Sequence, residues 1–466
     1  MSAVYLTGPP GSGKSQLARQ FGAKYFNEKT VNQEPESTKV SLENRSRATG
    51  TVVATLRAET PTAFLDSLKT LCSNLSIDVN QEALMTLPID GAIKHHIVEL
   101  QKVFRAKTFD WLLIVDNMTI NRPLSEFLPR PGKDQRDWGS GRVLITTQDN
   151  DLTPVSAHAY SKTLSLASGM EKHDALKLLS MVSGLENDVD AEYVAEKLNY
   201  YPLSLACAAV YVCEMRDDRP AANFTWKNYL SSLAQYFEHI DYSAFTENNP
   251  CYPQSMLPAA VLSARRMAQN SDVVRAAFEF LSECALAPVP LETVAEYAKK
   301  AGSNIFDPER LKAKIARCSL LFYPERGDRG VEVVTVHQVI KSAFKQLRRE
   351  ELVEPERMTH ERIVSVINTS YQAHLAAGDT KNIVTRILLS PHLQECATTG
   401  NRKEWTMSGI FMNCLVNLAD ALLHVSESTD SYRIELLEQA YGIYKNLGEY
   451  RVSEKMIIPI TATFVI

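Results

Sequence analysis

The stretch LTGPPGSGKS, residues 6–15, constrains this chain more than any other feature. It fits the pattern G-x-x-x-x-G-K-[ST] and lies between a short apolar segment and a helical pattern, as a strand–loop–helix phosphate site requires. The glycines let the backbone curl so that successive N–H groups point at phosphate oxygens, and the following helix adds its N-terminal dipole. Lys14 supplies a positive charge for the β- and γ-phosphates, and Ser15 supplies a hydroxyl ligand for Mg²⁺. We therefore predict nucleotide contacts along the loop, at Gly8, Pro9, Pro10, Gly11, Ser12, Gly13, Lys14, Ser15 and Gln16.

The region from residue 1 to 168 is expected to be an α/β domain around this loop. Its β-rich segments lie at 3–6, 51–56, 111–116, 142–147 and 159–166, and its helical patterns lie near 14–26, 62–74 and 92–106. Apolar strands separated by helices are typical of a parallel sheet covered on both faces. In the first helix, Leu17, Phe21 and Tyr25 recur at helical spacing and are expected to form its apolar face.

Two further strand ends carry polar residues. In FDWLLIVDN (109–117), Asp116 is predicted to face the phosphates through Mg²⁺, so Ser15 and Asp116 are the expected metal ligands. Lys14 and Asp116 are the expected catalytic residues. Asn117 has an amide that can hold an attacking water but cannot accept its proton, which predicts slow or absent hydrolysis. VLITTQD (143–149) ends in two threonines and Gln148, a candidate sensor of the γ-phosphate.

The rest of the chain is predominantly helical in pattern. Helices are predicted at 170–184, 188–213 and 225–240, and the Pro/Asn-rich segment at 246–254 favours a domain boundary. Within 256–350, several helices precede two short β-segments and a helix at 338–349, an order that suggests a winged-helix unit. We predict domains at 1–168 (P-loop, α/β), 169–250 (helical), 251–350 (winged-helix) and 351–466 (α-helical).

Composition excludes some environments. The net charge of −5 provides no overall basic field to attract nucleic acid or an anionic membrane. The longest apolar run, Leu198–Cys213, is too short for a membrane span and is interrupted by Pro202. No secretory signal is recognisable, and the eight cysteines contain no CxxC pair, so reduced thiols and a cytoplasmic location are expected.

Together these segments resemble the NB-ARC domain of STAND-class signalling NTPases, the group that contains plant resistance proteins and the apoptosome scaffold. The resemblance runs from about residue 3 to 350. VAEKLNYYPLSLACAAVYV (194–212) is similar to the helix–Gly-Leu-Pro-Leu–helix signature, with Pro202 and Leu203 at the Pro-Leu positions. The resemblance implies that this proline packs against the bound nucleotide and joins the helical subdomain to the P-loop domain.

A second family motif concerns the winged-helix region. VTVHQVIKSAFKQL (334–347) looks like the Met-His-Asp motif, with His337 as its histidine, which implies a contact to the β-phosphate of ADP that locks the closed state. The chain departs from the family pattern at Val336 and Gln338, which flank this histidine. It also carries Gln148 where many members have Arg, so γ-phosphate sensing by a charge is lost or supplied elsewhere.

The function implied by the resemblance is a switch that binds ADP or ATP with Mg²⁺ and controls oligomerisation or partner recruitment. Self-association or protein partners are expected through the C-terminal helices, where LLEQAYGIYKNLGEY (436–450) resembles the first helix of a tetratricopeptide repeat. No membrane or nucleic-acid partner is expected. The position of the loop near Met1 and the abrupt apolar ending at 456–466 favour a chain that is truncated at both ends.

Two alternatives stay open at this stage. A small-molecule P-loop kinase would need an arginine-rich lid, and the early arginines at 45, 47, 57 and 105 form no cluster. A nucleic-acid-binding regulator could use the segment at 307–320, which carries four basic residues, Arg310, Lys312, Lys314 and Arg317. Such charges are more often a solvated helix face.

Overall fold

The computed structural model describes most of the chain, in two compact units. The first unit contains residues 1–170 and 201–203, and the second contains 171–200 and 204–466. The described residues are 2–31, 50–79, 87–106, 110–119, 124–129, 138, 141–148, 161–186, 188–218, 224–237, 256–302, 305, 307–322, 330–350, 355–375, 380–406, 408–425 and 430–447. The expected boundary at 246–254 and the chain end at 456–466 lie outside these ranges.

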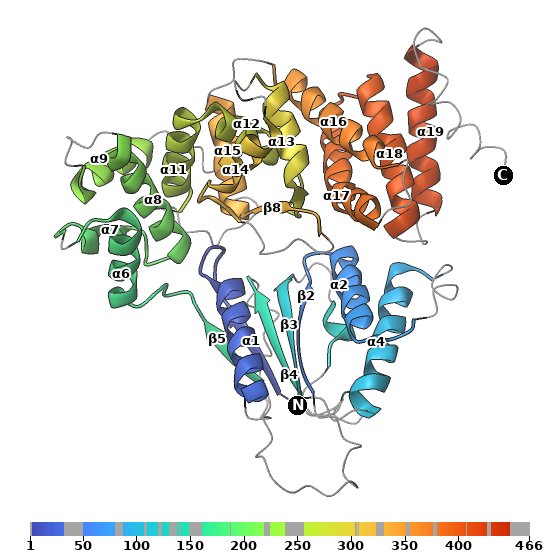
Figure 1. The fold of residues 1–466 in the computed structure, drawn as a ribbon, viewed down its shortest axis with the longest axis horizontal. Helices are drawn as coiled ribbons and strands as arrows, with labels where there is room; N and C mark the ends of the chain where they lie inside the picture. The colour runs from blue at the N-terminus through green and yellow to red at the C-terminus, as the bar shows by residue number, and fades with distance from the viewer. Residues whose placement is uncertain are drawn as a thin grey trace, which may run out of the picture. The chain divides into compact units, whose positions relative to one another are not determined.

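The first unit is built on a five-stranded parallel sheet, which confirms the predicted α/β class. Its strands are β1 (Ser2–Thr7), β2 (Thr51–Arg57), β3 (Asp110–Met118), β4 (Gly141–Thr147) and β5 (Ser161–Ser165). Their order is β2-β3-β4-β1-β5, so β4 lies between β1 and β3 (Figure 1). The carboxyl ends of β3, β4 and β1 are therefore neighbours, and the phosphate-loop motif follows β1 in sequence.

Alternation along β3 divides the core of the sheet between its two faces. Trp111, Leu113 and Val115 belong to the larger apolar cluster, which also includes residues of α2 (Pro61–Asn74) and α4 (Ile89–Ala106). The intervening residues Leu112 and Ile114 belong to the cluster under α1 (Lys14–Val31). A strand buried on both faces is expected in a parallel sheet covered by helices.

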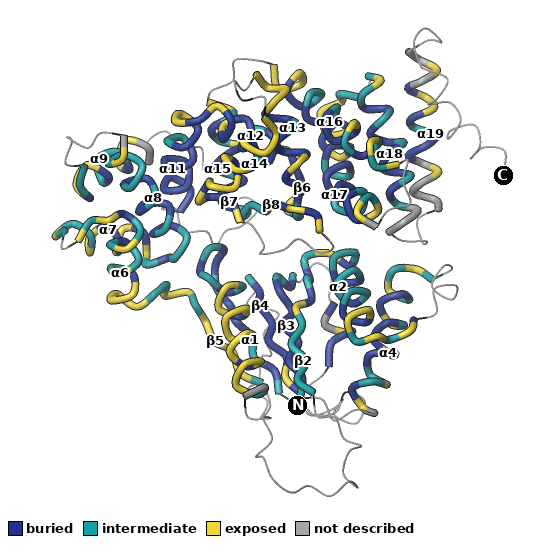
Figure 2. The backbone as a smooth tube through the Cα atoms, viewed as in Figure 1, coloured by how far each residue is buried: buried dark blue, intermediate teal, exposed yellow. Residues whose placement is uncertain are grey.

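The prediction for the buried face of α1 is wrong. Leu17 and Phe21 are 44% and 46% exposed, whereas Ala18 is fully buried and Tyr25 nearly so. Exposed segments run along much of α1 (Figure 2). A Cβ atom on Gly22 would come within 2.8 Å of the Ile114 side chain. The helix thus packs on the sheet through small residues that permit close approach, and its larger apolar residues lie on the outside.

The helix predicted at 188–213 is two helices. The chain forms α7 (Ala191–Lys197), then turns at Asn199 and Tyr200, and resumes as α8 (Pro202–Asp218). Both turn residues have positive φ angles, 54° and 56°, which end a right-handed helix. The other helices predicted nearby are present as α6 (Lys172–Ser183) and α9 (Trp226–Phe237).

The second unit continues with helices and a small antiparallel sheet. Its helices are α11 (Met256–Asn270), α12 (Asp272–Glu283), α13 (Leu291–Lys300), α14 (Pro308–Ala316), α15 (Gln338–Glu350), α16 (Glu356–Ala373), α17 (Thr380–Arg402), α18 (Gly409–Val425) and α19 (Asp430–Leu447). The small sheet has the order β6-β8-β7, formed by β6 (Val289–Pro290), β8 (Val333–Val336) and β7 (Leu321–Phe322). Among the described helices, none combines the length and apolar character needed to cross a membrane.

A buried ionic cluster joins three helices of this second unit. Glu283 at the end of α12 pairs with Arg348 of α15, and it also lies 3.2 Å from Nδ1 of His360 in α16. Burial would by itself raise the pKa of Glu283, but the hydrogen bond with His360 and the charge of Arg348 lower it to about 2. The cluster fixes α16, the first of the C-terminal helices, against α12 and α15.

A candidate phosphate-binding site at the β1–α1 loop

The loop between β1 and α1 has the backbone geometry that the motif predicts. Gly8 and Gly13 have φ angles of +148° and +90°, a region that residues with a Cβ rarely adopt. A Cβ on Gly8 would also lie 3.0 Å from the Ser12 hydroxyl and 3.3 Å from the backbone of Leu166. The loop can therefore be this tight only with glycine at its first position.

Lys14 closes the loop on itself. Its ammonium group donates hydrogen bonds to the carbonyl oxygens of Gly8, at 2.7 Å, and Pro9, at 2.9 Å. Burial lowers the pKa of Lys14 to about 8, against an opposing effect of the Asp116 charge. Phosphate oxygens could replace the two carbonyl groups as partners of this ammonium group, because they are stronger, charged acceptors.

The Ser12 hydroxyl provides a test of whether a ligand fits. It is buried at the centre of the loop, and no hydrogen-bond partner for it exists among the described residues. A buried hydroxyl without a partner is costly and uncommon in native proteins. A phosphate oxygen in the loop would satisfy it, so these residues fit a phosphate group. Of the remaining predicted loop residues, Pro9 and Pro10 are buried and Gln16 is exposed.

Asp116, at the end of β3, is held by partners from both neighbouring elements. Its Oδ1 accepts hydrogen bonds from the hydroxyl groups of Ser15 and Thr146, each at 2.6 Å. Its Oδ2 lies 3.4 Å from the guanidinium group of Arg19, one helical turn after Ser15. The carboxylate and the Ser15 hydroxyl are the pair that the sequence predicts as Mg²⁺ ligands, and their direct contact places both oxygens where one cation could be shared.

The sequence reasoning missed Thr146 and Arg19. Thr146 also accepts a hydrogen bond from the backbone N–H of Asn117, at 2.8 Å, so one hydroxyl orients two consecutive residues at the end of β3. Asn117 itself has a φ angle of 61°, a conformation that asparagine tolerates better than most residues. A signal for Thr146 was present in the paired threonines of VLITTQD.

Gln148 directly follows β4, next to the beginning of the phosphate loop. Thr147 of β4 is paired in register with Thr7 of β1, and these are the last residues of the two strands. Gln148 and Gly8 therefore leave the sheet side by side. Gln148 is half-buried. Gln148 therefore lies close to the start of the loop, and its predicted role in sensing the γ-phosphate stays a prediction.

Pro202 and Leu203 lie against the phosphate loop, within the first unit. The backbone N–H of Leu203 donates to the carbonyl oxygen of Gly11, at 3.3 Å. A Cβ on Gly13 would lie 3.6 Å from Cγ of Pro202, which is van der Waals contact. Tyr201 fixes the same segment, because its hydroxyl donates to the carbonyl oxygen of Ala167 at 2.8 Å. The first turn of α8 is thus bonded to the loop itself.

His337 belongs to the second unit, between β8 and α15. Its Nδ1 accepts a hydrogen bond from the backbone N–H of Val339, at 3.2 Å, so the imidazole caps the start of α15. With Nδ1 as an acceptor, a neutral ring carries its proton on Nε2. The capping contact accounts for a histidine at this position within the unit, and the predicted contact to a nucleotide stays a prediction.

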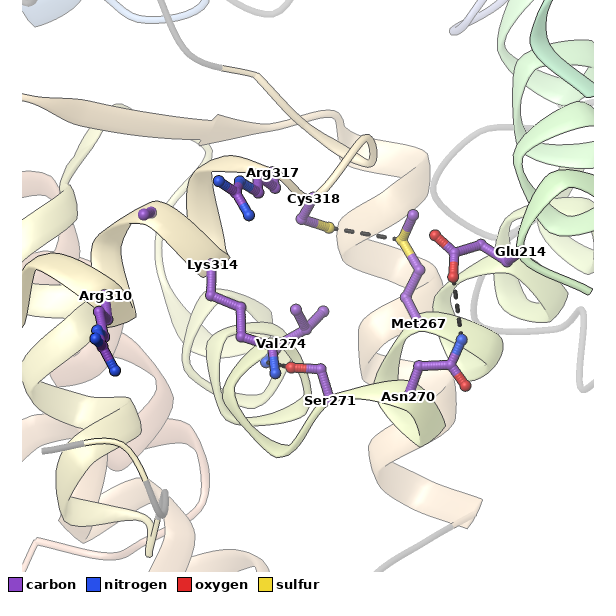
Figure 3. A pocket seen from close by; sticks show the side chains of 10 residues that line it. Glu214, Met267, Asn270, Ser271, Val274, Arg310, Lys314, Arg317 and Cys318 are labelled. Atoms are coloured by element: carbon purple, nitrogen blue, oxygen red, sulfur yellow. Dashed lines mark hydrogen bonds between the residues drawn. The ribbon is translucent and has the colours of Figure 1, made fainter. Parts of the chain in front are cut away.

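The four basic residues of the segment at 307–320 do not share one surface. Arg310, Lys314 and Arg317 line one side of a pocket of about 490 Å³ (Figure 3). Its other side includes Asn270, which donates a hydrogen bond to Glu214. Lys312 instead lines a different pocket and pairs with Glu309 and Glu332. The segment therefore lacks the continuous basic face that the nucleic-acid alternative assumed.

Comparisons with known proteins add two distant structural similarities. No family model matches the sequence, and no curated protein matches it. Among solved structures, the chain is similar to a Signal Transduction ATPase with Numerous Domains (STAND) protein with a tetratricopeptide repeat sensor from Pyrococcus horikoshii. The two share 13% identity with a TM-score of 0.42, over 99% of this chain and 58% of the length of that protein. It is also similar to Drosophila ORC bound to DNA, at 13% identity and a TM-score of 0.35, over 74% of this chain and 81% of that one.

The chain's own geometry defines its class. A parallel sheet of order β2-β3-β4-β1-β5, a glycine-rich loop from β1 into α1, and an aspartate at the end of β3 are the elements of a P-loop NTPase-like domain. A mainly helical region follows that domain.

Proposed function

We propose that this chain is a STAND-type switch that binds ADP or ATP with Mg²⁺ at the β1–α1 loop and responds to the nucleotide by changing its association with other proteins. Gly8 to Gln16 would enclose the phosphates, and Ser15 with Asp116 would hold the metal. Oligomerisation or partner recruitment would use the C-terminal helices. Hydrolysis would be slow, which suits a protein that retains its nucleotide.

One observation carries the proposal. The carbonyl oxygen of Gly11 in the phosphate loop accepts a hydrogen bond from Leu203, at the start of α8, and Pro202 packs beside Gly13. A loop that tightens or relaxes around different phosphates would therefore act directly on α8. A kinase that only positions two substrates has no need for such a connection to a helical region.

The proposal extends to the helical region. The order helix, strand, two helices, strand, strand, from α12 to β8, is that of a winged helix, and we assign it as one. His337 at its end would contact the β-phosphate of ADP in the closed state. The domain limits at 168, 250 and 350, the tetratricopeptide-like character of the last helices and the cytoplasmic location belong to the same proposal.

The first experiment identifies the nucleotide that the purified protein retains. The protein is denatured after gel filtration, and the released nucleotide is separated by ion-exchange chromatography. We expect ADP, in a near-stoichiometric amount. Purified protein without nucleotide, which also fails to bind added ADP or ATP in equilibrium dialysis, would exclude the proposal.

A second experiment tests the connection to α8. Pro202→Ala should release a fluorescent ADP analogue about tenfold faster than the wild type, because a rigid apolar contact to the loop is lost (about 1.4 kcal/mol). Pro308→Ala is the matched control, since Pro308 also begins a helix, α14. Equal ADP release rates in Pro202→Ala and Pro308→Ala would contradict the coupling between the phosphate loop and α8. His337→Ala should also accelerate ADP release, and an unchanged rate would exclude its nucleotide contact.

A further inference from the structure

The end of β2 carries the two charged groups that the ends of β3 and β4 lack. Asn117 stands where a second acid would accept a proton, and Gln148 stands where a cation would sense the γ-phosphate. Strand β2 is the hydrogen-bonded neighbour of β3; it ends at Arg57, and Ala58 and Glu59 follow it. Arg57 is paired in register with Asp116, and the N–H of Ala58 donates to the Asp116 carbonyl oxygen at 2.8 Å.

Alternation decides which face these side chains occupy. Leu56 belongs to the apolar cluster that includes residues of α2 and α4, so Arg57, the last residue of β2, points to the opposite face. Glu59 follows two residues later in a bend, close enough to Asp116 and Arg57 for both charges to act on its carboxyl group. Asp116 also points to that opposite face, because its carboxylate binds Ser15 at the start of α1. Arg57 therefore lies on the face of the sheet that α1 covers, beside Asp116. Glu59 comes directly after Ala58, whose N–H is bonded to the Asp116 backbone, and its carboxyl group is near the Asp116 charge.

The electrostatic environment of Glu59 agrees with this placement. The side chain is half-buried, and burial is the main cause that raises the pKa of its carboxyl group. The negative charge of Asp116 raises that pKa further, whereas the positive charge of Arg57 lowers it. A carboxylate whose pKa is raised is a better proton acceptor than an ordinary exposed glutamate.

We propose that Glu59 is the general base of an ATP hydrolysis reaction at this site, with Arg57 as the residue that keeps it ionised. The proposal rests on the nucleotide site proposed above. Glu59 takes a proton from a water molecule while the water oxygen forms a bond to the γ-phosphorus. The bond from that phosphorus to the bridging oxygen breaks, ADP leaves with the electron pair, and inorganic phosphate is released. The proton then passes from Glu59 to solvent.

The central test compares Glu59→Gln with the wild type in a single turnover of pre-bound ATP. We expect hydrolysis to slow by at least about 100-fold, the low end of the usual contribution of a general base. The affinity for ATP, measured by equilibrium dialysis, should change by less than about threefold, because the phosphates are held by the loop. After loading and gel filtration, the variant should retain ATP where the wild type retains ADP.

Two further variants keep the test independent of folding defects. Glu59→Asp preserves a carboxylate and should recover part of the rate. Asp66→Asn is the matched control: Asp66 also has a pKa raised by burial and an interaction with Arg57, but it lies on α2. It should hydrolyse ATP at the wild-type rate. In Arg57→Gln, the pH at which the rate reaches half its maximum should move upward, because the charge that favours ionised Glu59 is lost.

The outcomes separate the two proposals. Equal hydrolysis rates in Glu59→Gln and the wild type would overturn the assignment of the base. ATP binding without any turnover in the wild type would also overturn it, while the nucleotide switch would survive. Failure of the wild type to bind nucleotide would overturn both.

Discussion

The low pKa of Lys14 leads to a specific pH dependence of nucleotide binding. The ammonium group is buried in the phosphate loop, which lowers its pKa to about 8. The phosphates bind the protonated ammonium form of Lys14. At higher pH, Lys14 must therefore take up a proton when the nucleotide binds. About three quarters of the nucleotide-free protein is protonated at Lys14 at pH 7.5, and about 3% at pH 9.5, which predicts an affinity loss of about 25-fold, or about 1.9 kcal/mol.

The measurement is the dissociation constant of ADP by isothermal titration calorimetry between pH 7.5 and 9.5. The slope of the logarithm of the dissociation constant against pH should approach one above pH 8.5. Lys14→Arg is the matched variant, because a guanidinium group stays charged throughout this range, and its affinity should be nearly independent of pH. Lys24→Ala, on the exposed side of α1, should keep the wild-type slope.

Protein stability provides a second measurement with the opposite sign. The folded-state pKa of Lys14 lies below its ordinary value of 10.5, so the unfolded chain binds more protons between pH 8 and 10.5. The contribution of Lys14 to stability therefore rises with pH across the interval in which nucleotide binding weakens. A pH-independent affinity in the wild type, or an equal slope in Lys14→Arg, would refute the role of this ammonium group in phosphate binding.

Two predictions concern the fold. Glu283→Gln should destabilise the second unit by about 3 kcal/mol, since one pKa unit corresponds to about 1.4 kcal/mol and the pKa of Glu283 is lowered to about 2. The stabilisation that ionised Glu283 provides should be lost as the pH falls from about 4.5 to 2. Glu192→Gln, in the exposed pair with Lys172, should leave the free energy of unfolding in urea almost unchanged. Equal destabilisation by Glu283→Gln and Glu192→Gln would contradict a stabilising role of the buried cluster. Tyr200→Gly should remove a left-handed strain of about 1–2 kcal/mol, so an unchanged or higher melting temperature is expected, and a clear decrease would mean that the tyrosine ring's packing outweighs the strain.

The local elements of the P-loop domain were predictable from sequence for a physical reason. Strand and helix periods, the spacing of the loop glycines and the acidic end of β3 are properties of short segments. Each of the five strands and the helix after the loop appear where the pattern places them. The contact between Ser15 and Asp116 was also predictable, because the ends of parallel strands meet at one edge of a sheet.

Other features depended on which elements become neighbours. The buried face of α1 was predicted wrongly because an apolar stripe indicates burial only where space allows, and the sheet accepts Ala18 and Gly22 instead of Leu17 and Phe21. The apolar pattern alone predicted one helix at 188–213, because no glycine or asparagine-glycine signal marks the turn at Tyr200. The resemblance of 194–212 to a helix–Gly-Leu-Pro-Leu–helix signature did imply two helices there.

The sequence by itself determined that this chain has a phosphate loop on a parallel sheet, because curling glycines, a lysine and a following helix are encoded within ten consecutive residues. Only the tertiary structure decided what surrounds that loop. Strand pairing brings Arg57 and Glu59 beside Asp116, and the fold of α8 brings Leu203 to the carbonyl oxygen of Gly11. These contacts join residues far apart in the chain, and they depend on tertiary packing that short sequence segments do not predict.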